Sequence, residues 1–283
     1  HEIRSLFVDT NDDIYAGLYQ SNYSGFLWRY DESEDEWRQY GGNYIKGGWG
    51  YYGMEGIENM TTAMGKLYAG TGNNTPGDAQ VWEFDGESWS IVGGQEINGS
   101  WEREKHQSVT SMASFRNELY VGLGTTAGYG EVWKFDGEEW ENIANSSTTG
   151  WVATIERVLS MAADDDYLYV GLGVTQPTDS QIFRWNGTSW QQIAGRLTGS
   201  GSGSVNSSWS AAIEGVYSLM ANEGKLYAGL GTSNVDSDIW EFNGTDAWTQ
   251  IGGDGINSSW NSSPTNEFEV VEYISMHRGQ IYV

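Results

Sequence analysis

Cysteine is absent from this chain, and basic residues are scarce. Without cysteine there are no disulfide bonds, no thiolate metal ligands and no cysteine nucleophile. The chain has 14 Lys and Arg against 39 Asp and Glu, a formal net charge of -25. Nucleic-acid binding depends on cationic side chains at the phosphates, and anionic membrane surfaces attract the same cations. We therefore expect no nucleic-acid partner and no attraction to anionic membranes.

Long apolar runs are also missing, and none approaches the roughly 18 residues that predict a membrane span. This segment is therefore not expected to insert into a membrane. The chain begins at His1 without a leader-like segment. We expect a processed or trimmed chain, with any leader or anchor outside these residues.

Glycine and aromatic residues are abundant, with 39 Gly, 15 Trp and 17 Tyr. Disordered chains are poor in aromatics, so this composition indicates a packed protein. Apolar residues alternate or run briefly, and they rarely follow a helical period of 3.6 residues. The composition therefore predicts an all-β protein of short strands joined by tight turns.

A repeat of roughly fifty residues runs through the chain, as fixed-period copies of one supersecondary unit would. Its clearest element is a six-residue strand motif such as Leu119-Tyr-Val-Gly-Leu-Gly124. The first version is Ile14-Tyr-Ala-Gly-Leu-Tyr19, and a partial one is Ile281-Tyr-Val283. The anchoring tyrosines of the copies are Tyr15, Tyr68, Tyr120, Tyr169, Tyr227 and Tyr282.

Each full copy has the same internal order: an apolar run, the tyrosine strand, an aromatic strand and a tryptophan strand. Four copies place Asp-Gly or Asn-Gly between the last two strands, which predicts a two-residue type I′ turn. Those dipeptides begin at Asp85, Asp136, Asn186 and Asn243.

Tryptophan recurs at equivalent places in the copies, which favours packing between repeats over a local ligand site for the strand tryptophans. For the loop tryptophans both interpretations stay open. The strand positions are Trp37, Trp89, Trp140, Trp190 and Trp248, and the loop positions are Trp49, Trp101, Trp151, Trp209 and Trp260.

Four short strands per copy predict a β-propeller in which neighbouring four-stranded blades cover each other's faces. We expect one domain over residues 1–283, with six blades favoured and five or seven as alternatives. The repeats are expected at 3–56, 57–109, 110–158, 159–216 and 217–270, with a partial copy at 271–283.

The pattern resembles kelch and related bacterial and archaeal secreted propeller repeats. Their features here are a tyrosine strand ending in glycines, an aromatic strand such as Val132-Trp133, and an outer-strand tryptophan such as Trp140. Most copies have Gly-x-Gly where kelch repeats have Gly-Gly. The resemblance implies the propeller architecture and no particular activity, because propellers carry many functions.

The last copy stops after two strands, and three interpretations stay open. The chain is a fragment of a larger ring, or its end strands close a split first blade, or they pair with another subunit and build a polymer. The residues of this end expected to take part in assembly are Tyr273, Ile274, Ile281, Tyr282 and Val283.

Asn-x-Ser/Thr sequons are more frequent than chance predicts, which favours an N-glycosylated, exported protein at the cell surface. Some belong to repeated turns, so repetition inflates their number. The sequons are Asn22, Asn59, Asn73, Asn98, Asn145, Asn186, Asn206, Asn243, Asn257 and Asn261.

No catalytic constellation stands out, since the three histidines form neither a metal motif nor a serine triad. We expect no enzyme; a polysaccharide-acting one remains the outside alternative, because 39 acids offer many carboxylate pairs. No cofactor or metal is required. Calcium at the acidic turns Asp9–Asp13 and Asp164–Asp166 is the alternative to solvated turns, which we favour.

The leading hypothesis is therefore a non-catalytic extracellular propeller with a structural or adhesive role, such as a self-associating subunit of a surface layer or filament. A carbohydrate-binding lectin is the alternative, because polar amides beside an indole suit sugars. Its predicted ligand-binding residues lie in the repeated Asn-x-Ser-Trp loops and are Trp101, Trp209, Asn257 and Trp260.

Overall fold

The structure is a computed structural model of the 283-residue chain. It describes residues 2–20, 25–50, 54, 56–72, 75–102, 105–124, 129–151, 155–173, 180–196, 204–209, 215–231, 237–253, 255–260 and 270–283.

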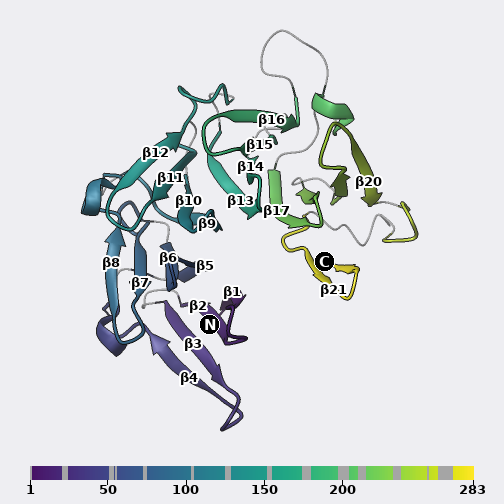
Figure 1. Cartoon of the computed structure of the whole chain (residues 1–283). Coiled ribbons are helices and arrows are strands. Elements are labelled where there is room, and N and C mark those ends of the chain that lie inside the picture. The colour runs from purple at the N-terminus through teal and green to yellow at the C-terminus, as the bar shows by residue number, and fades with distance from the viewer. Residues whose placement is uncertain are drawn as a thin grey trace. The chain divides into compact units, whose positions relative to one another are not determined.

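The chain divides into two compact units, each with its own contacts. Unit 1 comprises His1–Thr125 and Glu131–Ile143, and unit 2 comprises Thr126–Gly130 and Ala144–Val283. Figure 1 follows both units along the chain and labels most of their strands. The expectation of a single domain stays a prediction.

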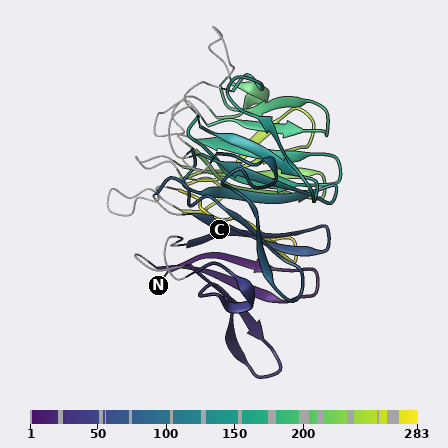
Figure 2. The ribbon, with the colours of Figure 1, turned by 90° about the vertical axis from the view of Figure 1, so that its left-hand side faces the viewer.

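Unit 1 holds the first three copies of the repeat, and each forms a four-stranded antiparallel blade. Figure 2 shows the first blade at the purple end of the ribbon. The strands are β1 (Glu2–Val8), β2 (Ile14–Tyr19), β3 (Phe26–Asp31) and β4 (Glu36–Gly41) in blade 1; β5 (Gly56–Ala63), β6 (Lys66–Gly72), β7 (Val81–Phe84) and β8 (Trp89–Gly93) in blade 2; and β9 (Val109–Phe115), β10 (Glu118–Leu123), β11 (Glu131–Phe135) and β12 (Trp140–Ala144) in blade 3.

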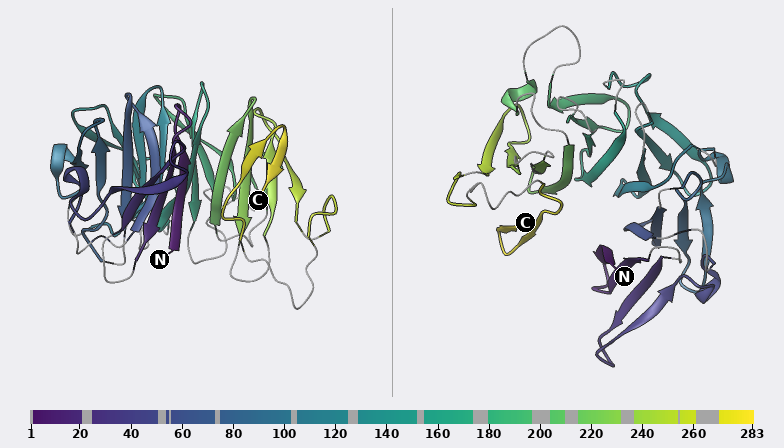
Figure 3. Two further views of the ribbon diagram at one scale, coloured as in Figure 1. Left: turned by 90° about the horizontal axis from the view of Figure 1, so that it is seen from below. Right: turned by 180° about the vertical axis from the view of Figure 1, so that it is seen from behind.

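Unit 2 holds two further blades and a two-stranded hairpin at the C-terminus, shown in yellow in Figure 3. The strands are β13 (Arg157–Ala163), β14 (Leu168–Gly173), β15 (Ile182–Trp185) and β16 (Trp190–Ala194) in blade 4; β17 (Gly215–Asn222), β18 (Lys225–Gly231), β19 (Ile239–Phe242) and β20 (Trp248–Gly252) in blade 5; and β21 (Ser275–His277) and β22 (Gln280–Tyr282) in the hairpin.

The all-β propeller fold predicted from the repeat is therefore confirmed. The described residues contain no α-helix, only the 3-10 turns Ile45–Gly47, Ile97–Gly99 and Val205–Ser207. No helix among them has the length and apolarity needed to traverse a bilayer.

The glycine after the repeated tyrosine is required because the next blade lies directly against it. A Cβ added at Gly70 in blade 2 would stand 2.7 Å from Val109 Cγ1 in blade 3. At Gly171 in blade 4 the same atom would stand 2.7 Å from Val216 Cγ1 in blade 5. The Tyr-x-Gly motif therefore records the close approach of neighbouring blades.

A polar side chain on the first strand of a blade ties that blade to the next one. Ser160 Oγ donates to Val216 O at 2.8 Å, and Ser218 Oγ donates to Val271 O at the same distance. In blade 2 the position is Asn59, whose Nδ2 donates to Val109 O at 3.1 Å. These bonds satisfy main-chain carbonyls that would otherwise be buried without a donor.

The predicted two-residue type I′ turns at Asp-Gly and Asn-Gly are wrong. Between β7 and β8 only Gly86 has a positive φ, whereas Asp85 does not. Asp85 Oδ1 instead accepts the N–H groups of Glu87 and Ser88, so residues 85–88 form a four-residue loop closed by a side chain. Asn186 accepts from Thr188 and Ser189 in the same way.

Paired positive φ angles occur instead between the first and second strands of several blades. They lie at Met64-Gly65 (52° and 73°), Arg116-Asn117 (51° and 64°) and Glu223-Gly224 (50° and 76°). Both central residues of a type I′ turn need positive φ, so these are the tight hairpins of the blades.

Candidate binding site between the tryptophan-bearing loops and blades

The Asn-x-Ser-Trp loop is a turn held by its own side chains. Asn98 has φ 54° and its Nδ2 donates to Val92 O at 3.1 Å, while Ser100 Oγ accepts from Gly94 N at 2.8 Å. Trp101 Nε1 donates to Ala79 O at 3.0 Å. The same bonds recur around Trp209 and Trp260. The motif is therefore explained by local structure before any ligand is considered.

Two of the three predicted stacking tryptophans are inaccessible. Trp101 is 2% exposed and Trp209 is 4% exposed, so neither presents a ring face to a sugar. Asn257 is exposed, but its Nδ2 donates to Ile251 O at 2.9 Å. Trp260 is half-buried and is the one predicted ligand-binding ring with an accessible surface.

Each buried loop tryptophan packs against two aromatic rings of the following blade, edge-on in all of these pairs except Trp151 with Phe183. Trp101 lies 5.9 Å from Trp133 and 5.3 Å from Trp140, between ring centroids. Trp209 lies 5.9 Å from Trp240 and 5.4 Å from Trp248. Trp49 has the same arrangement with Trp82 and Trp89, and Trp151 contacts Phe183 and Trp190. Such edge-to-face groups stabilise the contact between blades beyond the area they bury.

In three of these groups the fourth-strand indole reaches back to a carbonyl of the preceding blade. Trp89 Nε1 donates to Tyr40 O at 3.0 Å, Trp140 Nε1 to Val92 O at 2.8 Å, and Trp248 Nε1 to Ile193 O at 2.8 Å. The predicted role of the strand tryptophans in packing between repeats is therefore seen directly at these positions.

Trp260 borders an open pocket. The pocket has a volume of about 500 Å³ and is lined by Ser237, Trp260, Val270, Val271, Glu272, Tyr273 and Val283. Tyr273 is 65% exposed and Val283 is 61% exposed. We call this the Trp260 socket. It lies wholly within unit 2 and combines an apolar wall with one acid.

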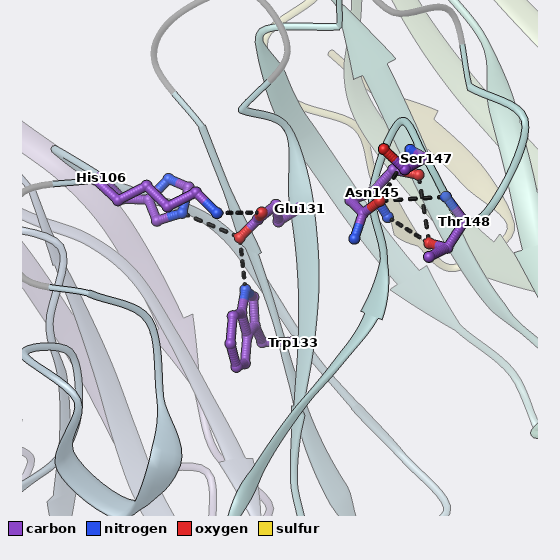
Figure 4. Close-up of polar contacts among 7 residues, drawn as sticks. His106, Glu131, Trp133, Asn145, Ser147 and Thr148 are labelled. Carbon is purple, nitrogen blue, oxygen red and sulfur yellow. Dashed lines mark hydrogen bonds and ion pairs between the residues drawn. The ribbon is translucent and has the colours of Figure 1, made fainter.

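A buried charged cluster in blade 3 was not found from the sequence. The Glu131 carboxylate, 5% exposed, accepts bonds from Lys105 Nζ at 2.7 Å, Trp133 Nε1 at 2.9 Å and the ring nitrogen His106 Nε2 at 3.1 Å. Figure 4 shows the carboxylate between the His106 and Trp133 rings. The sequence gives one signal for this cluster. When the third strands are aligned, Glu131 of blade 3 takes the position that is Gln80 in blade 2 and Gln181 in blade 4.

The hydrogen bonds at this cluster keep Glu131 ionised. Burial by itself raises the pKa of Glu131, but the bonds from His106, Lys105 and Trp133 outweigh it and lower the pKa from 4.5 to about 2. An acid with such a pKa carries no proton to donate near neutrality. The cluster therefore reads as a structural ion pair rather than a catalytic acid.

The repeated tyrosines share a hydrogen bond to a carboxylate. Tyr68 Oη donates to Glu83 Oε2 at 2.8 Å, and Tyr169 Oη donates to Asp164 Oδ2 at 2.8 Å. Burial first, and then the carboxylate, raise the pKa of both phenols. These hydroxyls are therefore protonated donors over the whole physiological range.

The two acidic turns use their carboxylates internally. Asp9 Oδ1 accepts from Asn11 N at 2.8 Å and Asp13 N at 3.0 Å, and Asp164 Oδ1 accepts from Asp166 N and Tyr167 N. Asp13 also pairs with Arg29. The described part of the chain holds no group of three or more metal-ligating side chains. Calcium at these turns stays an untested alternative.

The described sequons differ in their surroundings. Asn186 and Asn243 are exposed in hairpin loops, and Asn145 Oδ1 accepts from Ser147 N and Thr148 N in a loop that Figure 4 shows. Asn59 is engaged between blades 2 and 3. Modification at any of them stays a prediction. Five of the described sequon asparagines donate their side-chain nitrogen within the protein, namely Asn59, Asn98, Asn206, Asn243 and Asn257. Asn22, Asn73 and Asn261 lie outside the described residues.

The predicted assembly residues divide into covered and exposed ones. Ile274 is 5% exposed and packs with Tyr227, Ile239 and Val271, so it belongs to the core of unit 2. Ile281 is half-buried. Tyr282 is 49% exposed, and with Tyr273 and Val283 it presents apolar surface at the C-terminal hairpin.

No known protein family and no curated protein matches the sequence. Solved structures share the fold at low identity. Sqt1 of Saccharomyces cerevisiae matches with a TM-score of 0.56 and 12% identity over 90% of this chain, which spans 63% of that chain. The Aleuria aurantia lectin, solved with Fucα1-6GlcNAc, matches with 0.53 and 10% over 87% of this chain and 77% of its own.

A structure of prolyl endopeptidases matches with a TM-score of 0.53 and 12% identity over 90% of this chain, which spans 36% of that chain. Sqt1 and the prolyl endopeptidases contain β-propellers. The chain is therefore a β-propeller. At these identities the likeness concerns the fold alone, and the kelch resemblance receives no support from a family match.

Proposed function

We propose that this chain is a non-catalytic extracellular β-propeller with a structural or adhesive role, which self-associates through its exposed end strands. The observation that supports this proposal is exposed apolar surface on β1 and at the C-terminal hairpin. Ile3, Leu6 and Val8 on β1 are 63%, 60% and 57% exposed, and Tyr282 and Val283 at the C-terminal hairpin are 49% and 61% exposed. Corresponding first-strand residues of blade 2, such as Ile57, are fully buried against blade 1.

Exposed aliphatic side chains on a strand favour association with another apolar strand face. The excess of sequons and the net charge of -25 support an exported, soluble surface protein. The buried Glu131 carboxylate is held ionised by its hydrogen-bond partners, which agrees with a non-catalytic role.

Sedimentation across a range of protein concentrations tests the proposal, with electron microscopy of the associated fraction. We expect concentration-dependent oligomers or filaments that are lost in a Leu6→Lys, Val8→Lys variant and on deletion of residues 271–283. Tyr44→Lys is the matched control, because Tyr44 is 72% exposed in a loop away from these strands. A wild-type protein that stays monomeric throughout would reject self-association.

A lectin is the second candidate, and the Trp260 socket is the observation that favours it. The socket places a half-buried indole beside Glu272, a combination that suits stacking and hydrogen bonding to a sugar. The fold likeness to the Aleuria lectin agrees with this candidate without adding to it. Glycan-array binding that disappears in Trp260→Ala protein would favour the lectin, and turnover of a polysaccharide would instead reveal an enzyme.

A further inference from the structure

We infer that a second pocket, in unit 1, binds a carbohydrate through its hydroxyl groups. This pocket has a volume of about 470 Å³, which suits a small ligand, and every residue that lines it belongs to unit 1. We call it the Tyr15 pocket. It is separate from the Trp260 socket of unit 2, and it goes beyond the proposed self-association, which it does not require.

Turns of three blades line the Tyr15 pocket. Blade 1 contributes Asp9, from the turn between β1 and β2, and Tyr15 at the beginning of β2. Blade 2 contributes its tight turn Met64-Gly65 and Asp85 after β7, and blade 3 contributes Asn117 from the turn between β9 and β10. The pocket therefore collects polar side chains from turns that lie far apart in the sequence.

Aromatic rings supply the apolar part of the lining. Tyr15, Tyr40 and Phe84 all line the pocket, and Tyr40 packs edge-on against the other two, with ring centroids 5.8 Å from Tyr15 and 4.9 Å from Phe84. An apolar wall with a few fixed polar groups is the usual construction of a site for a small organic ligand.

The buried hydroxyl of Tyr15 lacks a hydrogen bond of ordinary length among the described residues. Tyr15 is 5% exposed, yet its Oη lies 3.5 Å from Asp9 Oδ2, whereas Tyr169 Oη in blade 4 lies 2.8 Å from Asp164 Oδ2. Asp9 precedes its tyrosine by six residues and Asp164 by five, so the blade 1 turn is one residue longer. Buried hydroxyls normally have a partner at about 2.8 Å, so Tyr15 Oη retains bonding capacity at the pocket wall.

The gap between Tyr15 and Asp9 selects the chemistry of the ligand. Burial first, and then the Asp9 charge, raise the pKa of Tyr15, so its hydroxyl stays a donor. Asp9 Oδ1 already accepts from Asn11 N and Asp13 N, and its Oδ2 faces Tyr15 as an acceptor. A ligand group between the two must accept from Tyr15 and donate to Asp9. A hydroxyl does both, whereas an ammonium group only donates and a phosphate only accepts.

Two more side chains can bind further hydroxyls of the same ligand. Asp85 Oδ1 accepts from Glu87 N and Ser88 N, whereas its Oδ2 has one contact, Ser88 Oγ at 3.5 Å, among the described residues. Asn117 Oδ1 accepts from Met64 N at 2.9 Å, which leaves Nδ2 able to donate. Several acceptors and donors around apolar rings fit a polyhydroxylated ligand, and a sugar is that ligand.

The test measures binding of the full chain to an array of neutral mono- and oligosaccharides, followed by titration calorimetry with the sugar that binds. Tyr15→Phe removes only the hydroxyl. We expect it to weaken binding about tenfold and to leave the melting temperature unchanged, because no bond of ordinary length is lost. Tyr169→Phe is the matched control: it removes a 2.8 Å bond outside the pocket, so it should lower the melting temperature and leave binding unchanged.

Asp85→Asn tests the second acceptor in the same way. Asparagine keeps the oxygen that closes the loop, as Asn186 does in blade 4, and replaces Oδ2 by a donor. We expect a loss of binding of about tenfold. Asp136→Asn is the control, because it makes the same charge change in the same loop of blade 3, with bonds from Glu138 N and Glu139 N, outside the pocket.

Wild-type protein that binds no sugar on the array, or Tyr15→Phe protein that binds as tightly as the wild type, would overturn the inference. Binding that is lost in Trp260→Ala and retained in Tyr15→Phe would assign sugar recognition to the Trp260 socket instead. Spermidine or inorganic phosphate that binds where no sugar does, with the binding lost in Asp85→Asn, would also overturn it. A monomeric protein that binds a sugar through Tyr15 would reject self-association and support this inference, so the two failures are distinguishable.

Discussion

Glu131 makes the stability of blade 3 sensitive to acid. Its pKa is about 2 in the folded protein against an ordinary value of 4.5. A carboxyl group whose pKa is lower in the folded protein stabilises the fold at any pH above its pKa in the unfolded chain. This stabilisation is lost as the pH falls from about 4.5 towards 2. The shift corresponds to about 3 kcal/mol at neutral pH. We expect urea unfolding of the wild type to show that loss between pH 5 and pH 2.

The variant Glu131→Gln tests this origin of the acid sensitivity. Gln80 and Gln181 occupy the same position in blades 2 and 4, so glutamine fits the site and can still accept from Trp133. We expect the variant to be less stable by about 2 kcal/mol at pH 7 and to approach wild-type stability near pH 2. A difference that stays constant across this pH range would refute the ion-pair explanation.

Trp140 and Trp37 occupy the same position of the repeat in different surroundings, so the effects of substituting them can be compared. Trp140 is 6% exposed and donates to Val92 O, whereas Trp37 in blade 1 is 43% exposed. Phenylalanine removes the N–H and leaves a buried carbonyl with one donor fewer, so Trp140→Phe should cost about 2 kcal/mol. Trp37→Phe should stay within about 0.5 kcal/mol of the wild type. Equal effects in chemical denaturation would show that the bond between blades contributes little.

The strand that carries the repeated tyrosine depends on its glycine. In Gly171→Ala the new Cβ would stand 2.3 Å from Ser160 Oγ and 2.7 Å from Val216 Cγ1 of the next blade. Neither residue can retreat without moving a strand, so we expect a loss of about 3 kcal/mol, read from the denaturation midpoint. Gly252→Ala is the control, because its nearest contact would be Ile239 Cδ1 at 3.2 Å, a flexible side-chain end. A tolerated Gly171→Ala would mean that blades 4 and 5 can separate slightly.

The strands were predictable because their signal is local and repeated. The tyrosine strand alternates in the same way in every copy, so its existence and its neighbours follow from the sequence. The turns were harder to predict. The dipeptide Asp85-Gly86 is compatible with a two-residue turn and with a four-residue loop, and only the hydrogen bonds from Glu87 N and Ser88 N to the Asp85 carboxylate decide between them. Local residue types do not reveal which N–H groups a side chain will reach.

The candidate site could not be predicted from the sequence, because it depends on contacts that the spacing of residues along the chain does not reveal. Trp101, Trp209 and Trp260 share one motif, yet two are enclosed by rings of the following blade and the third lines a pocket. Glu131 lies 25 residues from His106, and nothing in the spacing indicates that a loop carries the histidine to it. Both features follow from packing between blades, which becomes visible only when the blades are in place.

The chain's acidity acts over its entire surface rather than at one group. A net charge of -25 on 283 residues produces self-repulsion that favours expanded states, and salt screens it with a Debye length of about 10 Å at 0.1 M. We expect the melting temperature to rise by several degrees between about 0.01 M and 1 M NaCl.

Calcium separates this general effect from a defined site. At Asp9 and Asp164 one carboxylate oxygen already accepts two N–H groups, so the turns are complete without a cation. Millimolar CaCl2 and MgCl2 at equal ionic strength should therefore raise the melting temperature equally and without saturation. A saturable rise with calcium alone, lost in Asp9→Asn or Asp164→Asn protein, would instead establish a calcium-binding turn. Screening depends on ionic strength and does not distinguish calcium from magnesium, so it cannot produce that difference.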